Sequence, residues 1–156
     1  MLIGAFADAD WGSIKGNLNP ADVGLIGQEK LDRSWAVGAR LGWLPTDRFL
    51  AYVSGGYTNA YFKQIDYNSF SLAGDPPGVF TPAQNYGGWF IGTGYEYNLG
   101  WLPGLTWKTE YRFADYGSHT DPIADSATGA VIGVMNSKRF VQTLSSELVW
   151  RFNWDR

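Results

Sequence analysis

The most constraining feature of this sequence is a strict alternation of apolar and polar side chains between residues 105 and 113. One set of alternate positions holds Leu105, Trp107, Thr109, Tyr111 and Phe113, and the positions between them hold Thr106, Lys108, Glu110 and Arg112. A β-strand turns successive side chains to opposite faces, whereas a helix would scatter the rings around its cylinder. The segment therefore predicts a strand with one apolar face and one charged face.

Five further segments alternate in the same way, and they lie at 2–14, 34–43, 48–61, 88–99 and 140–154. In the 48–61 segment the phase is blurred by Gly55 and Gly56. Two aromatic residues, Phe6 and Phe90, fall on the otherwise polar face. The pattern predicts an all-β, antiparallel up-and-down fold in which this chain supplies six strands.

The two faces carry different residue types. The polar face is rich in Gly and ions, and we predict that its charged groups line a lumen: Asp8, Asp10, Arg40, Glu96, Lys108, Glu110, Arg112, Glu147 and Arg151. The apolar face carries aromatic rings near the strand ends, and we predict that these lie at membrane–water interfaces: Trp35, Trp43, Trp89, Tyr97, Trp107, Trp150, Phe152 and Trp154.

The alternation alone fits two opposite folds. A soluble calycin-like barrel would turn the rings inward around an apolar ligand, whereas a barrel in lipid would turn them outward. The connections favour the barrel in lipid: short turns at 44–47 and 100–104 alternate with long polar stretches at about 15–31, 63–85 and 115–137. Outer-membrane barrels have short periplasmic turns and longer external loops. We therefore expect a transmembrane barrel with these three stretches as external loops.

Composition excludes several other classes. The absence of Cys rules out a disulfide scaffold and a thiol nucleophile. The net charge of −3 argues against a nucleic-acid partner, which needs a basic stripe. Charged side chains on neighbouring strands should pair and fill a narrow lumen, so we expect no open diffusion pore.

Four stretches together resemble the small porin-like surface antigens of Gram-negative outer membranes: WAVGARLGWLPTDRFLAYVSGGYTNA (35–60), GWFIGTGYEYNL, LTWKTEYRFADYG and LVWRFNW. The resemblance implies an eight-stranded barrel with a cleavable signal peptide. We expect that the signal and the first hairpin are missing, so that residues 1–156 are the C-terminal part of one outer-membrane β-barrel domain.

The same resemblance implies a structural and surface-antigen role in the outer membrane of a Gram-negative bacterium, with at most weak porin-like passage of solutes. The implied partners are outer-membrane lipid, an unidentified surface ligand and the barrel-insertion machinery. That machinery would read the C-terminal strand, although Glu147 stands where the recognition pattern has Gly.

A rim lipid hydrolase is the catalytic alternative, because Ser118 and His119 lie near Asp115 and Asp121. Adjacent residues of a strand point to opposite faces, so Ser118 and His119 should not pair. We predict no enzyme activity, no cofactor and no metal site. The acidic and amide residues of the loops (Asp66, Asn68, Asp75, Asp121 and Asp125) are expected to be solvated.

Overall fold

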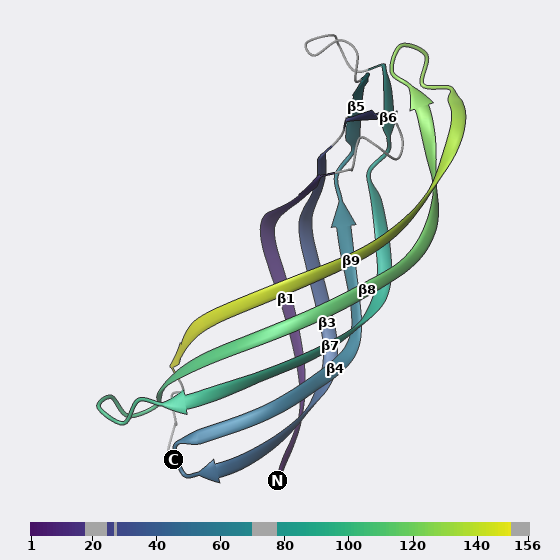
Figure 1. Cartoon of the computed structure of the whole chain (residues 1–156). Helices are drawn as coiled ribbons and strands as arrows, with labels where there is room; N and C mark the ends of the chain where they lie inside the picture. Colours follow the sequence, from purple (N-terminus) through teal and green to yellow (C-terminus); the bar gives the residue numbers. More distant parts are fainter. Residues whose placement is uncertain (18–24, 27, 70–77, 151–156) are drawn as a thin grey trace, which may run out of the picture.

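The computed structural model describes residues 1–17, 25–26, 28–69 and 78–150, and it is built from β-strands. Six long strands lie where the alternation predicts them: β1 (Leu2–Asn17), β3 (Gln28–Thr46), β4 (Phe49–Phe62), β7 (Gln84–Asn98), β8 (Leu105–Asp125) and β9 (Val131–Trp150). Three short strands lie at the upper end in Figure 1: β2 (Leu25–Ile26), β5 (Ile65–Ser69) and β6 (Val79–Thr81). No helix among these residues is long and apolar enough to cross a membrane.

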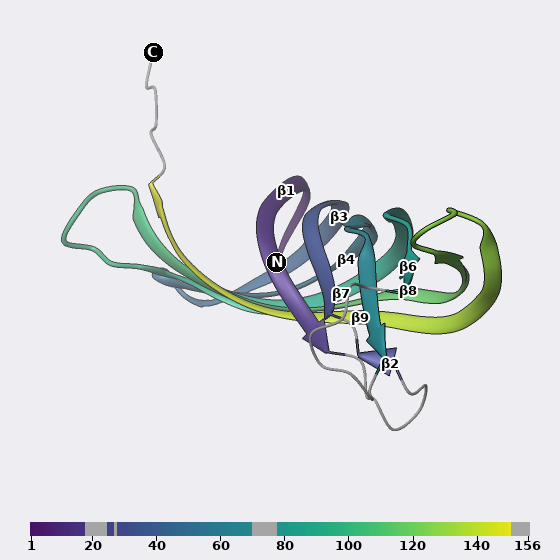
Figure 2. The ribbon, with the colours of Figure 1, turned by 90° about the horizontal axis from the view of Figure 1, so that it is seen from above.

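The long strands form an antiparallel, up-and-down sheet in the order β1-β3-β4-β7-β8-β9. Each strand pairs with its neighbours along the chain, and the sheet curls into a trough when seen from above (Figure 2). Within the described residues, β1 and β9 do not pair with each other, so the trough is open on that side. The predicted all-β, up-and-down class is confirmed.

At the upper ends of the strands the structure differs from the predicted loops. The stretch 115–137 is not a loop, because β8 continues to Asp125 and β9 begins at Val131. The Asp125 carboxylate closes the tight turn by accepting hydrogen bonds from the Ala127 and Thr128 backbone N–H groups, at 3.0 and 2.8 Å. We call residues 116–139 the arm. Within the stretch 63–85, β5 pairs with β6, and β6 pairs with the upper end of β8.

The convex face of the trough carries the large apolar side chains, including Val53, Ile91 and Leu144, and the last of these is 74% exposed. Aromatic rings lie on this face in two bands. The upper band holds Trp35, Tyr57, Trp89, Phe113 and Phe140, and the lower band holds Trp43, Phe49, Tyr95, Tyr97, Trp107 and Trp150. Eight residues separate Trp35 from Trp43 and Trp89 from Tyr97, which is about 26 Å along a strand.

The concave face holds the buried core in its upper half, formed by Leu31, Ala36, Ala60, Phe62, Tyr86, Phe90, Ala114 and Tyr116. The Phe90 ring packs over Gly38 and Gly56. A Cβ atom at Gly38 would lie 2.9 Å from the Phe90 Cζ atom, so the ring fits only because Gly lies beneath it. Phe6 meets Phe90 edge-on at 5.9 Å. This packing explains why two aromatic residues depart from the alternation.

Candidate functional site: the charged concave face

Glu110 is the hub of an ion network on the concave face, and its side chain is only 3% exposed. One carboxylate oxygen accepts hydrogen bonds from Arg112 Nε and Nη2, at 3.1 and 2.8 Å. The other accepts from the Tyr52 hydroxyl at 2.8 Å and from Arg40 Nη2 at 3.3 Å. A buried carboxylate is tolerated only when it is paired and hydrogen-bonded in this way.

The network extends across the trough. Arg112 on β8 donates two parallel hydrogen bonds to Asp8 on β1, at 3.0 and 2.7 Å. Arg40 on β3 donates to Glu96 on β7 at 3.0 Å, and its guanidinium lies 4.0 Å from the centre of the Tyr52 ring. Lys108 lies between Glu110 and Glu147, at 3.7 and 3.5 Å. The Arg112–Asp8 and Arg40–Glu96 contacts tie together strands that are not neighbours in the sheet.

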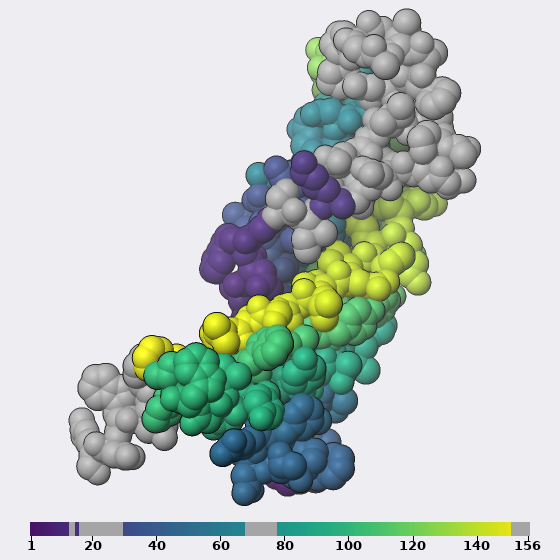
Figure 3. Space-filling model, turned by 60° about the vertical axis from the view of Figure 1, so that its left-hand side comes forward, coloured from purple at the N-terminus to yellow at the C-terminus, as the bar shows by residue number. Residues whose placement is uncertain are grey.

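A groove of about 430 Å³ runs between β1 and the pair β8 and β9, on the open side of the trough. Its lining includes Asp8, Asp10, Lys108 and Glu147. Asp10 makes no ion pair with any described residue, and Glu147 is 48% exposed. In the space-filling view β9 forms a ridge along this side of the molecule (Figure 3). The charged network therefore joins β1, β3, β7, β8 and β9 and is unfinished between β1 and β9.

The structure brings together seven of the nine charged groups that the sequence analysis selects: Asp8, Arg40, Glu96, Lys108, Glu110, Arg112 and Glu147. Asp10 lies on the same face, and Arg151 is outside the described residues. Of the selected aromatic residues, Phe152 and Trp154 are also outside, and the other six lie on the convex face. Tyr52 also belongs to this network and is not among the predicted residues, although its even position in β4 continues the inward phase and would have identified it.

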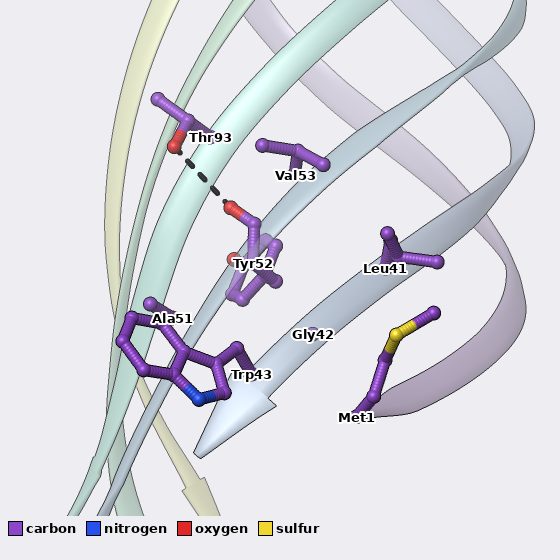
Figure 4. Close-up of a pocket in the computed structure, with 8 residues that line it drawn as sticks. All are labelled: Met1, Leu41, Gly42, Trp43, Ala51, Tyr52, Val53 and Thr93. Carbon is purple, nitrogen blue, oxygen red and sulfur yellow. Dashed lines mark hydrogen bonds between the residues drawn. The ribbon is translucent and has the colours of Figure 1, made fainter. Parts of the chain in front are cut away.

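Three side chains on the convex face make hydrogen bonds within the sheet. Trp107 Nε1 donates to Ser146 Oγ at 2.7 Å, and the Tyr111 hydroxyl donates to Gln142 Oε1 at 3.0 Å. The Thr93 hydroxyl donates to the Tyr52 carbonyl oxygen at 3.2 Å, beside a shallow apolar groove whose lining includes Leu41, Trp43 and Val53 (Figure 4). A surface in contact with acyl chains requires such internal pairing, because lipid offers no hydrogen bonds.

A second buried ion pair lies in the arm, beyond the upper aromatic band. Arg139 donates to Asp121 at 2.7 Å, and both side chains are essentially inaccessible. The Ser137 and Tyr86 hydroxyls also donate to this carboxylate, at 2.6 and 2.5 Å. The expectation that Asp121 is a solvated loop residue is wrong, since it points inward from β8. Continuing the odd-numbered inward phase of β9 back to Arg139 would have found its partner.

Stability of the arm should depend on pH through Asp121. Burial raises the pKa of this carboxyl, but the hydrogen bonds from Ser137, Tyr86 and Arg139 outweigh burial and lower the pKa below its ordinary value of 3.8. A depressed folded-state pKa gives stability that is complete above the ordinary pKa and is lost as pH falls through the folded value. We expect the protection of the amides in 119–139, relative to the intrinsic exchange rate at each pH, to fall below about pH 4.

Asp121→Asn tests the origin of that dependence. Loss of the charged acceptor should destabilise the arm by about 1.5–3 kcal/mol at neutral pH and should remove the acid dependence of its amide protection. Asp66→Asn is the matched control, because Asp66 is an exposed carboxylate on β5, outside the arm. An unchanged acid dependence in Asp121→Asn would show that another group governs it.

The serine–histidine pair of the hydrolase alternative is not assembled. His119 Nε2 lies 2.6 Å from the Tyr116 carbonyl oxygen, and its ring lies 4.5 Å from the Tyr86 ring. Ser118 is exposed on the other face of β8. Among the described residues, no three His, Cys, Asp or Glu side chains gather as metal ligands.

Comparison with known proteins gives two curated relatives. The chain is 31% identical over 122 residues to the 31 kDa outer-membrane immunogenic proteins of Brucella melitensis biotype 1 and Brucella suis biovar 1. The match covers 75% of this chain and 48% of each relative, so the chain spans about half the length of the relatives it matches. No family model matches the chain, and no solved structure matches it significantly.

The chain is an outer-membrane protein. Its relatives come from Gram-negative bacteria, and its curled all-β sheet, with the apolar face outward, fits that location. The similarity also relates it to the outer-membrane immunogenic proteins, which agrees with the resemblance noted in the sequence.

Proposed function

We propose that this chain forms most of a small transmembrane β-barrel whose role is structural, and which presents its external strands at the cell surface as an antigen. The observation that carries the proposal is the polarity of the trough, with apolar and aromatic side chains on the convex face and a paired ion network on the concave face. A soluble barrel requires the opposite arrangement. The two aromatic bands are supporting evidence, because Trp and Tyr favour the membrane–water interfaces.

The curvature supports a closed barrel of eight strands. Strands about 4.8 Å apart and tilted by about 40° close at a radius of about 8 Å for eight strands and about 12 Å for twelve. Asp8 and Arg112 bridge β1 and β8, which are four positions apart in the sheet. In an eight-stranded barrel those two strands face each other across the axis, at a distance that one Asp and one Arg can span.

Two further strands would then fill the open side between β9 and β1. We propose that the full-length protein supplies them as a hairpin that precedes β1, after a cleavable signal peptide. The support is the unpaired edges of β1 and β9 in the described residues and the greater length of the curated relatives. Unpaired backbone edges are not tolerated in lipid, because each unsatisfied group costs several kcal/mol.

The filled interior supports a role in envelope structure and surface display rather than in catalysis or free diffusion. The ion network and the rings of Phe6 and Phe90 lie in the path along the axis, and the T-shaped pair of Phe62 and Tyr86 lies above them. We infer at most weak passage of solutes. The same proposal places the barrel in outer-membrane lipid. It also makes the barrel-insertion machinery a partner that recognises the C-terminal strand.

Quenching by brominated phospholipids tests this orientation. All seven described Trp side chains are exposed on the convex face, at the strand ends or in the 99–104 turn. In vesicles of brominated phosphatidylcholine we expect most of the Trp fluorescence to be lost, relative to unbrominated vesicles, in a preparation with heat-modifiable gel migration. Unquenched emission from such a folded preparation would overturn the proposal.

A further inference from the structure

A small hollow on the convex face lies at the level of the upper aromatic band, and neither the barrel nor its ion network accounts for it. It has a volume of about 140 Å³, and its lining includes Trp11, Arg33, Trp35, Asn59, Tyr61 and Asn85. Four of these form one row across the sheet, because Trp11 pairs with Arg33, Arg33 with Tyr61, and Tyr61 with Asn85. The hollow is thus built by four adjacent strands rather than by a loop.

Arg33 is the charged group of this hollow. Its guanidinium lies 4.6 Å from the centre of the Tyr61 ring, which holds it along the sheet surface. Within the part of the chain that the structure describes, Arg33 makes no ion pair. The neighbouring carboxylate of Asp32 is engaged by Lys63 at 2.7 Å. Among the described side chains, no carboxylate competes for the donors of Arg33, so they can bind an anion from outside the protein.

The surroundings of the hollow are positive although the chain as a whole carries a net charge of −3. A hydrogen bond from Lys63, with the nearby charges of Lys63, Arg33 and Lys30, lowers the pKa of Asp32. Three cations thus act on a single carboxylate at this point of the surface. Asn59 and Asn85 add amide groups that can donate hydrogen bonds to the same anion.

We infer that this hollow binds a phosphate group of an outer-leaflet lipid. The inference rests on the proposed function, since it requires the convex face to contact lipid and the arm to lie outside the membrane. A guanidinium fork matches a phosphate in charge and geometry. The volume corresponds to about four or five waters, which suits one phosphate group rather than a sugar chain. The rings of Trp11 and Trp35 lie beside it, at the depth where a headgroup meets the acyl chains.

Lipid binding by the purified full chain in neutral detergent micelles provides the test. The probes are diphosphoryl lipid A and a galactosyl diacylglycerol, which lacks phosphate, and the bound lipid is counted by native mass spectrometry. We expect preferential retention of lipid A and about a tenfold weaker affinity for it in Arg33→Gln, which corresponds to about 1.4 kcal/mol. Arg48→Gln, which removes an exposed Arg in the turn between β3 and β4, at the other end of β3 from Arg33, should bind as the wild type does.

Three results would overturn the inference: equal retention of lipid A by Arg33→Gln, equal retention of the galactolipid by the wild type, or displacement of lipid A by millimolar inorganic phosphate. The last result would mean that the site takes free anions rather than lipid. Heat-modifiable migration separates this failure from failure of the barrel proposal. A variant that keeps the migration and loses lipid A supports the site, whereas loss of the migration in the wild type would refute the barrel itself.

Discussion

Glu110→Gln is expected to lower the free energy of unfolding by about 3–5 kcal/mol, the range for breaking a buried ion pair from one side. The substitution keeps the shape of the side chain and removes its charge. Arg40 and Arg112 then lose a shared counter-ion, and Lys108 loses one of its two carboxylates. The concave face would hold three cations around a neutral amide.

Urea unfolding in lipid vesicles, followed by Trp fluorescence, measures this effect. Glu147→Gln is the matched control, because Glu147 contacts the same Lys108 but is 48% exposed, and an exposed pair is worth about 0–1 kcal/mol. If the two substitutions shifted the unfolding midpoint equally, the hub role of Glu110 would be wrong.

Leu144→Arg should cost about 2–4 kcal/mol, the cost of a cation on the lipid face near the bilayer midplane. Leu144 lies on the convex face, and its partner Tyr111 also pairs with Thr93, midway between Trp89 and Tyr97 on β7. On a water-exposed surface the same substitution would fall within about 0.5 kcal/mol. The measurement is the unfolding midpoint in vesicles, compared with the wild type.

Ile132→Arg is the control for that experiment. Ile132 lies on the same strand and at similar exposure (61%), but on the arm beyond the upper band, where the register of β8 and β9 shifts. We expect a change within about 0.5 kcal/mol there. Equal costs at the two positions would contradict the assigned depth of the membrane.

The alternation was sufficient to predict six strands and the facing of most of their side chains. It failed for the arm, where Pro122, Gly133 and Asn136 read as loop residues. There the ladder between β8 and β9 overrides local preference, and Pro122 is accepted because β8 pairs with β9 alone at that point. The Asp121–Arg139 pair was missed for the same reason, because the sequence of one strand does not show which residues of the neighbouring strand lie opposite.

The bridge between Asp8 and Arg112 has a consequence for assembly. It joins residues 104 positions apart in the chain, so it cannot form until the polypeptide is present as far as β8. Contacts of such long sequence separation make folding slow, because the entropy of closing the loop is lost before the contact is gained. β1 must therefore wait, unpartnered across the axis, until β8 arrives, and during that interval its apolar face needs protection from aggregation.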